Sequence, residues 1–453
     1  MRELCEIKSK DLYKAVYDAC FKANTCLSKE VFETLKKLGE CGYENPDKMK
    51  KIFANNLIAS KNKRPLCQDT GQVVVFLEIG ENIVLDDKNP ITVVNEAISD
   101  CYKSNYFRKS VVKDALFDRT NTQDNIPAIV YVDYVRDDVI RANILIKGGG
   151  AENMSSVKMF TPSATKEEIL NYVLSVVKTA GENACPPLFL GVGIGGTIDY
   201  AGVLSKKAFF SDENKDFALK MKDYINKNSQ AKVADIFIKT SSTHIASMPV
   251  CVTVNCHSTR HSSVVVDKNG YELVTEFVEN EKENVIQDAL KEISVEDIEV
   301  LKSLEVNQEF LLSGTVYTAR DMAHKKLVEM IKNGEQLPFE LKNSIIFYAG
   351  PCPKNENEII GPVGPTTAKR MDKFAPLLYE NGVLATIGKG ERSELVKESI
   401  KDNSALYFAV QGGVASLLQS CVENAQVIAF EELGAEAIYE LQIKRLPVRV
   451  ELK

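Results

Sequence analysis

The sequence predicts a mixed α/β protein of two domains, and three observations carry this prediction. The 453 residues are 44% hydrophobic and 26% charged, which is the composition of a globular protein long enough for two domains. Short apolar runs typical of strands alternate with segments of helical periodicity. A charge-rich, weakly apolar stretch at 279–297 reads as a solvated helix or connector and marks the boundary between the domains.

Residues 1–282 are predicted to form a mixed α+β domain. Apolar residues recur at helical intervals from Asp11 to about Lys37 and again from Met49 to Leu57. Runs rich in β-formers follow at 72–79, 127–135 and 139–146, and helical spacing returns at 166–178. This order predicts helices first and then strands interleaved with helices.

Residues 283–453 are predicted to form a smaller α/β domain. Four strand-like segments alternate with three helix-like ones: 309–314, 344–350, 383–388 and 405–410 against 319–334, 391–403 and 414–420. Such alternation favours helices layered on a sheet.

Charge and hydropathy exclude several classes of protein. A net charge of -7 and a pI near 5.5 oppose attraction to nucleic acid or to anionic lipid. The first residues lack the apolar core of a secretory signal, and no run approaches the ~20 apolar residues that span a bilayer. We therefore expect a soluble, cytoplasmic protein without nucleic acid or membrane partners.

Glycine-rich segments offer one candidate binding motif. GVGIGGT at 191–197 has the GxGxxG spacing of a dinucleotide site and follows an apolar run, but no helical pattern follows it directly. The segment after it also lacks a well-placed acidic residue for a ribose. An NAD-dependent oxidoreductase remains an alternative, although the helix and the acidic residue expected after its glycine motif are missing from the sequence pattern.

Three of the eleven cysteines stand beside turn-forming or polar residues. They are Cys67 in RPLCQDTG, Cys185 in ACPPLFLGVGIGG and Cys256 in VNCHSTRH. The odd count and the lack of CxxC pairs favour reduced thiols over a disulfide framework. Three thiolates could hold an iron-sulfur cluster and leave one iron open as a Lewis acid, or the cysteines could be buried structural residues.

Several charged and polar residues could act beside such a cluster. Arginines and a lysine near glycines or helix starts could bind the carboxylates of a small dicarboxylic acid: Arg108, Arg320, Arg370 and Lys389. Asp69 and Thr366 could exchange protons, but Asp69 could equally cap a turn and Thr366 a helix. His244 could be a site residue or one hydrogen-bonded in place.

Eight motifs in this order resemble the class I, iron-sulfur-dependent fumarate hydratases. They are RPLCQDTG, FDRTNTQDN, KGGGAEN, ACPPLFLGVGIGGT, NCHSTRH, SGTVYTARDMAHK, GPVGPTTAKRMD and GAEAIYELQI. The resemblance runs from about Asp11 to the C-terminus, and the boundary near residue 283 matches the junction between separate α and β subunits in some members. Tartrate dehydratases and mesaconate hydratases share most of the motifs.

The resemblance implies roles for residues in these motifs. Cys67, Cys185 and Cys256 would hold a 4Fe-4S cluster with one open iron, in an active site between the two domains. Asp69 would be the acid and Thr366 the base in dehydration of L-malate to fumarate, although the two roles could be exchanged. The implied substrate-binding residues are Gln68, Arg108, Gly149, Gly150, His244, Arg320, Arg370 and Lys389. A homodimer and a place in the tricarboxylic acid cycle are also implied.

The sequence departs from the family pattern at Ala151, where the glycine loop usually has a serine. Cys352 is an extra thiol that the pattern does not use, and Arg119 competes with Arg108 as a substrate-binding residue. L-Tartrate dehydratase and mesaconate hydratase remain alternative activities. An iron-sulfur redox sensor is the non-enzymatic alternative.

Overall fold

The computed structural model describes residues 4–42, 46–279 and 290–453. These residues form two compact units. Unit 1 comprises Met1–Pro65 and Asp69–Lys282, and unit 2 comprises Leu66–Gln68 and Glu283–Lys453. The predicted junction between residues 282 and 283 falls in 280–289, outside the described residues.

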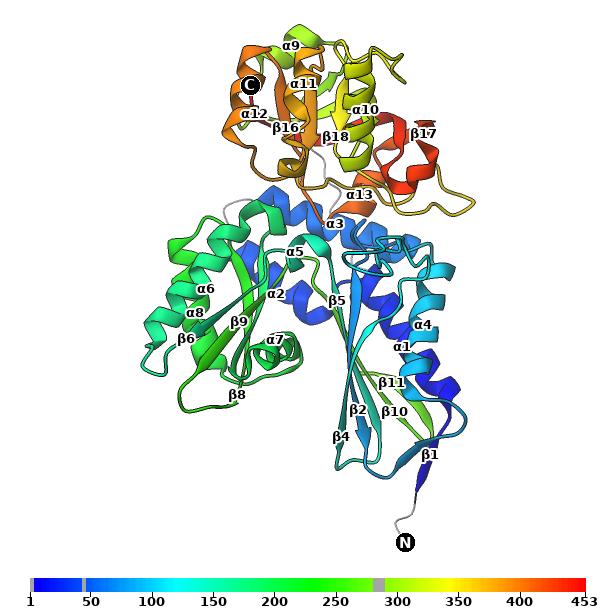
Figure 1. The fold of residues 1–453 in the computed structure, drawn as a ribbon, viewed down its shortest axis with the longest axis vertical. Helices are drawn as coiled ribbons and strands as arrows, with labels where there is room; N and C mark the ends of the chain where they lie inside the picture. The colour runs from blue at the N-terminus through cyan, green and yellow to red at the C-terminus, as the bar shows by residue number, and fades with distance from the viewer. Residues whose placement is uncertain (1–3, 43–45, 280–289) are drawn as a thin grey trace. The chain divides into compact units, whose positions relative to one another are not determined.

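Unit 1 contains a five-stranded sheet in the order β11-β10-β5-β2-β4. Only β2 and β4 pair in parallel within it; β2 with β5, β5 with β10 and β10 with β11 are antiparallel. Helices α1 and α4 pack together beside this sheet (Figure 1). The bounds are β2 Gln72–Gly80, β4 Ile129–Val135, β5 Ile140–Lys147, β10 Arg260–Asp267, β11 Gly270–Leu273, α1 Ser9–Thr25 and α4 Pro90–Ser104.

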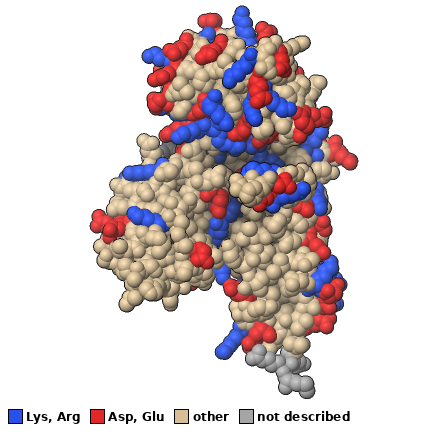
Figure 2. All heavy atoms as spheres, viewed as in Figure 1, with Lys and Arg blue, Asp and Glu red and all other residues tan. Residues whose placement is uncertain are grey.

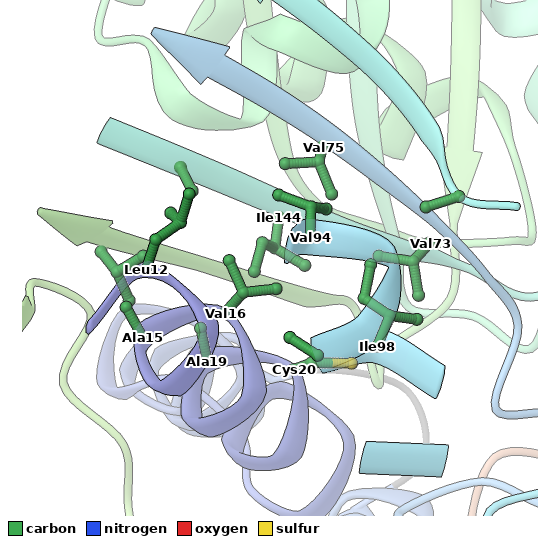
Figure 3. Close-up of a cluster of buried hydrophobic side chains, with 14 of the residues drawn as sticks. Leu12, Ala15, Val16, Ala19, Cys20, Val73, Val75, Val94, Ile98 and Ile144 are labelled. Atoms are coloured by element: carbon green, nitrogen blue, oxygen red, sulfur yellow. The ribbon is translucent and has the colours of Figure 1, made fainter. Parts of the chain in front are cut away.

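The core between these elements follows from the periodicities of the sequence. Leu12, Val16 and Ala19 lie on one face of α1 at helical spacing, and all are buried. Figure 3 shows this face opposite Val73 and Val75, which share one side of β2 because alternate strand residues point the same way. Burial of this apolar face fixes α1 on the sheet.

The predicted N-terminal helical region is not continuous. α1 ends at Thr25, and α2 (Lys29–Glu40) begins after Ser28, whose side chain accepts a hydrogen bond from the Val31 amide at 3.3 Å. This cap satisfies an amide at the start of the new helix, so the chain turns here instead of continuing α1. α3 (Pro46–Asn62) contains the predicted Met49–Leu57 segment.

A second, four-stranded sheet in unit 1 has the order β6-β9-β7-β8. Helices α6 and α8 share one hydrophobic core with it, while α7 packs against β7 and β9 (Figure 1). The strands are β6 Ser156–Phe160, β7 Leu188–Gly196, β8 Val233–Thr243 and β9 Met248–Asn255. The helices are α5 Gly149–Glu152, α6 Lys166–Ala180, α7 Ile198–Lys207 and α8 Lys215–Asn228. A small parallel pair, β1 Cys5–Ile7 with β3 Ile83–Leu85, completes the strands of the described part of unit 1.

The expectation that no helix directly follows GVGIGGT is wrong, because α7 begins one residue after it. Gly191 and Gly193 nevertheless lie inside β7, where a Cβ would meet the Ser205 carbonyl oxygen at 1.9 Å and the Ala201 carbonyl oxygen at 2.2 Å. These glycines therefore allow α7 to pack closely on the strand. In a dinucleotide fingerprint the first glycines form the turn, so the position of these two argues against that alternative.

Unit 2 is built on a seven-stranded sheet in the order β12-β13-β14-β15-β16-β18-β17. β12 to β16 pair in parallel, whereas the long β18 pairs antiparallel with β16, β17 and β13. The ladder β13-β14-β15-β16-β18 thus closes on itself. The strands are β12 Glu292–Ser294, β13 Glu309–Thr318, β14 Ile345–Phe347, β15 Ala385–Gly388, β16 Leu406–Ala409, β17 Val422–Ala429 and β18 Ile438–Leu452.

The helices of unit 2 are α9 Ile298–Ser303, α10 Asp321–Asn333, α11 Ala375–Glu380, α12 Glu394–Asp402 and α13 Ala415–Gln419. All four predicted strands and all three predicted helices of this region are found. The 279–297 stretch, expected as a helix or connector, contains β12 in its described part, because Ile293 is buried where this segment pairs with β13.

Among the described helices none is long and apolar enough to cross a bilayer. Acidic and basic side chains both occur on the visible face of each unit (Figure 2), in keeping with 56 Lys and Arg and 63 Asp and Glu residues in the sequence.

Candidate active site

Asp69 lies at the centre of one group of candidate site residues in unit 1. Its carboxylate accepts hydrogen bonds from the Gly149 amide at 2.7 Å and the Gly71 amide at 3.1 Å. Arg108 Nη2 lies 3.8 Å from Asp69 Oδ1, and Arg260 Nη1 donates to the Asp69 carbonyl oxygen at 2.7 Å. We call these four residues, Asp69, Arg108, Gly149 and Arg260, the Asp69 group.

The environment of Asp69 favours its ionised form. Burial alone would raise the pKa of Asp69, but the charges of Arg108 and Arg260 and the two amide hydrogen bonds outweigh burial, so its pKa lies below the usual value. The glycine loop approaches these charged groups closely, since a Cβ on Gly148 would lie 3.3 Å from Asp69 Oδ2 and 3.2 Å from Arg260 Nη2.

The chain segments that carry Cys185 and Cys256 contact each other in unit 1 through His257. The His257 amide and Nδ1 contact the Cys185 carbonyl oxygen at 3.2 and 3.1 Å, and Cys256 precedes His257 in the chain. Cys185 adopts a left-handed conformation (φ 56°) after a short 3-10 helix, which turns the chain into the Pro186-Pro187 segment. Cys256 Sγ lies 3.2 Å from the Ser258 hydroxyl.

Lys147 is buried beside the Cys256 segment, at the end of β5. Its ammonium donates to the Val254 carbonyl oxygen at 2.5 Å and to Asn255 Oδ1, and lies 3.4 Å from Glu152 Oε2. Burial lowers the pKa of Lys147 to about 8, a shift that Glu152 opposes. The ammonium form therefore still predominates at neutral pH.

Thr366 is the centre of a second group, in unit 2. Arg370 Nη1 donates to Thr366 Oγ1 at 3.1 Å, and Gln68 Nε2 donates to the carbonyl oxygen of the preceding Pro365 at 3.1 Å. Lys389 flanks the same segment, since its carbonyl oxygen accepts from the Ala368 amide at 2.9 Å. We call these residues, Gln68, Thr366, Arg370 and Lys389, the Thr366 group.

Carboxylates hold the arginines of unit 2 in place. Asp321, at the start of α10, pairs with Arg370 through Nε at 3.2 Å and through Nη2. Arg320 Nη2 lies 3.4 Å from Glu436 Oε1, and the same glutamate accepts from the Met322 amide at 3.0 Å. These pairs orient Arg320 and Arg370 at the N-terminal end of one helix.

A buried ion pair between Arg392 and Asp372 lies next to the Thr366 segment. Arg392 Nε donates to Asp372 Oδ1 at 2.7 Å, and Asp372 Oδ2 accepts from the Ser393 amide at 2.6 Å. The Arg392 guanidinium also lies 5.3 Å from the ring centre of Tyr348, whose carbonyl oxygen accepts from the Thr366 amide at 2.7 Å. This pair ties the turn after Thr366 to the chain after Lys389.

Other candidates lie outside these two groups. His244 is in the exposed turn Thr243–Ser247, where its Nδ1 accepts from the Ala246 amide at 3.1 Å. Arg119 is exposed and donates to the Ala115 carbonyl oxygen at 2.8 Å, so it is Arg108 that lies beside Asp69.

Gly150 lies next to Gly149 at the start of α5, and Ala151 is buried there. Thr366 does not cap a helix by its side chain, and Thr367 occupies the cap position of the following 3-10 helix instead.

The three cysteines fit an iron-sulfur ligand set by their chemistry. All are free thiols, and Cys67 and Cys185 are buried. Cys67 belongs to unit 2, where its Sγ lies 3.4 Å from Gln68 Oε1. Within the residues that the structure describes, no three His, Cys, Asp or Glu side chains form a group that could hold a metal ion.

Sequence reasoning missed Arg260, Lys147 and the Arg392–Asp372 pair. Arg260 stands inside the NCHSTRH motif, four residues after Cys256, so its position in a cysteine motif could have drawn attention to it. Lys147 is likewise the first residue of KGGGAEN. Nothing in the local sequence predicts that either cation is buried.

Comparison with known proteins identifies the class. The fumarate hydratase (fumerase) family matches residues 13–265, and the fumarase C-terminus family matches residues 263–453. The chain therefore belongs to the fumarate hydratase family, whose members are hydro-lyases. It is of the class I type, and class I fumarases are iron-sulfur enzymes.

Individual relatives support this class. The chain is 26% identical to the aerobic class I fumarate hydratase of Escherichia coli, over 96% of this chain and 86% of the relative. It is 27% identical to fumarate hydratase 2 of Leishmania major, over 87% and 76%. It is 34% identical to a putative L(+)-tartrate dehydratase subunit alpha of Methanocaldococcus jannaschii, over 47% of this chain and 82% of the relative.

Proposed function

We propose that the protein interconverts L-malate and fumarate by reversible hydration, with Asp69 and Thr366 moving the protons. The observation that carries this proposal is the setting of Asp69, a carboxylate held by two amides beside Arg108. Such a group is fixed in place and ionised, as a proton acceptor needs to be.

Cys67, Cys185 and Cys256 would hold a 4Fe-4S cluster with one open iron, because thiolates are the usual protein ligands of such clusters. When bound, the cluster supplies Lewis acidity at the hydroxyl that is added or removed. The chain's own residues supply the proton transfers and the binding of the carboxylates.

The resting protonation states suit hydration. The Asp69 carboxylate would accept a proton from water as the new C–O bond forms, and the Thr366 hydroxyl would give its proton to the neighbouring carbon. Arg370 donates to Thr366 Oγ1 at 3.1 Å, so it would stabilise the negative charge left on that oxygen. Dehydration of malate reverses both steps, with Asp69 as the acid and Thr366 as the base.

Basic residues of the two groups, together with Arg320, would bind the substrate carboxylates. Arg108 in unit 1 and Arg320, Arg370 and Lys389 in unit 2 offer guanidinium and ammonium donors for two carboxylates. Gln68, the Gly149–Gly150 loop and His244 are proposed to contact the substrate as well.

The test is anaerobic reconstitution with iron and sulfide, followed by a fumarate absorbance assay from L-malate. Tartrate and mesaconate are assayed in parallel, because the 34% identity to a tartrate dehydratase subunit keeps that activity as a second candidate. We expect turnover of malate that requires the cluster and is lost in air. A preference for tartrate or mesaconate would replace the substrate, and no turnover by a loaded protein would contradict the enzyme and favour a redox sensor.

The Asp69→Asn variant tests the proton-transfer role. It keeps the shape of the side chain but loses the charge, and general acid-base groups contribute about 10² to 10⁴-fold to rate. We therefore expect kcat to fall by at least about 10²-fold with the cluster retained. Normal turnover by the loaded variant would contradict the assignment.

A homodimer and a cytoplasmic location remain proposals from the resemblance and the sequence. Light scattering of the reconstituted protein tests the first, and a mass near that of one chain would contradict it.

A further inference from the structure

Lys147 is unusual for a lysine because its side chain is only 3% exposed. A buried ammonium is unfavourable unless its three donors are satisfied. Here the Val254 carbonyl oxygen and Asn255 Oδ1 accept two of them, and both acceptors come directly before Cys256. The lysine therefore contacts the segment that presents this cysteine.

Asn255 connects Lys147 to the far side of the turn that contains Cys256. Its Nδ2 donates to Thr259 Oγ1 at 2.8 Å, so one amide side chain joins the two ends of the Cys256–Ser258 turn. Lys147 fixes the oxygen end of that amide, which orients its nitrogen toward Thr259. The chain Lys147–Asn255–Thr259 thus restricts the positions open to Cys256, and all three side chains are buried.

The charges around Lys147 do not cancel. Glu152 is shared, with Oε2 3.4 Å from Lys147 and Oε1 2.8 Å from Lys206. Two ammonium groups facing one carboxylate leave an excess positive charge beside the Cys256 segment. A thiolate bound to iron would supply a balancing negative charge.

We propose that Lys147 is a positioning residue for Cys256 and a fixed positive charge for an iron-sulfur cluster bound there. This inference rests on the proposed function, in which Cys256 is a cluster ligand. Outer groups of this kind orient metal ligands, and their loss commonly weakens metal binding 10- to 100-fold.

The main test compares Lys147→Met with Lys206→Met, each reconstituted anaerobically. Methionine keeps much of the length of lysine but loses its charge and donors. Two quantities are measured on the same samples: the rate of iron loss to a chelator and the midpoint potential of the cluster. For Lys147→Met we expect iron loss about 10- to 100-fold faster than wild type and a lower potential, since a nearby positive charge favours the reduced cluster. Lys206→Met leaves the Asn255 contacts in place, and we expect a smaller change in both.

Wild-type rates and potential in Lys147→Met would overturn the inference. Thr259→Val is the second variant, because it breaks only the Asn255 bond and leaves the lysine charge in place. It should lose iron faster than wild type at an unchanged potential. If Lys147→Met fails to fold by circular dichroism, Thr259→Val decides the positioning role, and a wild-type rate in it would overturn that role.

Cys256→Ser separates this inference from the proposed function. If it loads and keeps a cluster as wild type does, Cys256 is not a ligand and the proposed site itself fails. If Cys256→Ser loses the cluster while Lys147→Met and Thr259→Val keep it, only the role of Lys147 is wrong.

Discussion

At the scale of single residues, the proposed role of Thr366 depends most strongly on its surroundings. A threonine hydroxyl has little tendency to ionise by itself, so its role depends on the hydrogen bond from Arg370 at 3.1 Å. Thr366→Val keeps the shape and removes the hydroxyl. We expect kcat for malate to fall about 10² to 10⁴-fold with a smaller change in KM, whereas Thr366→Ser keeps most of the activity. Equal kinetics for the valine and serine variants would argue against proton transfer by this residue.

His324 makes a pH-dependent contribution to the stability of unit 2. Its Nδ1 lies 2.8 Å from the Arg320 carbonyl oxygen, so Nδ1 carries the proton, and its buried Nε2 has no hydrogen-bond partner among the described residues. Protonation would place a second charged donor in this apolar site. Burial accordingly lowers the pKa of His324 from 6.5 to about 4.

The sign of the effect follows from the lowered pKa. Between pH 6.5 and about 4 the unfolded chain binds a proton that the folded chain does not, so stability is full above pH 6.5 and falls as the pH drops toward 4. The full shift corresponds to about 3 kcal/mol. His324→Asn keeps a donor for Arg320, and we expect its melting temperature to depend less on pH in this window. An unchanged pH dependence would rule out His324 as a main contributor.

The residue scale also shows where sequence reasoning stops. The motifs predicted that Asp69, Thr366 and the cysteines matter, because each stands among turn-forming residues. They did not predict Lys147 or Arg392, whose partners Asn255 and Asp372 lie 108 and 20 residues away in the sequence. Burial of a charged side chain depends on contacts between segments, and a single sequence does not display those contacts.

At the scale of secondary-structure elements, the packing of α7 on β7 depends on two glycines. A Cβ on Gly193 would lie 2.2 Å from the Ala201 carbonyl oxygen and 2.4 Å from the Ser205 amide nitrogen. Both are backbone atoms of α7, so Gly193→Ala requires the whole helix to shift. We expect a loss of about 1–3 kcal/mol in the free energy of unfolding.

Gly202 provides the control on the same helix. A Cβ there meets nothing within 4 Å, and alanine favours helix over glycine. Gly202→Ala should therefore be neutral or stabilising by up to about 1 kcal/mol. Denaturant melts of both variants check the pair, and equal stabilities would mean that α7 does not depend on close approach to β7.

Most elements could be predicted because local patterns define them. The strand β2 follows from a continuous run of β-branched and aromatic residues, and the helix α10 follows from the helical spacing of its apolar residues. The break at Ser28 was missed because helical spacing continues on both sides, and only the cap interrupts it. The β17–β18 pair was missed for another reason: its pairing with β13 and β16 is long-range.

At the scale of the whole molecule, unit 2 includes three residues from the N-terminal part of the sequence. The Leu66 carbonyl oxygen accepts from the Ala415 amide at 3.1 Å, and the Gln68 carbonyl oxygen lies 3.4 Å from Cys352 Sγ. A Cβ on Gly364 would lie 2.3 Å from Gln68 Oε1, so a side chain at this position would displace the amide of Gln68. The Cys352 thiol, an extra cysteine by its sequence context, thus packs against the segment that carries Cys67.

The inclusion of Leu66–Gln68 in unit 2 predicts how the protein behaves when its chain is cut between residues 282 and 283. Because a relative named as a subunit alpha aligns with 47% of this chain, we expect the two fragments to fold together and dehydrate malate when co-expressed. Fragment 283–453 alone lacks Leu66–Gln68, so its melting temperature should be lower than in the co-expressed form, and neither fragment alone should be active. Calorimetry and the fumarate assay check both points. A fragment 283–453 that melts identically with and without its partner would show that the three residues add nothing to the stability of unit 2.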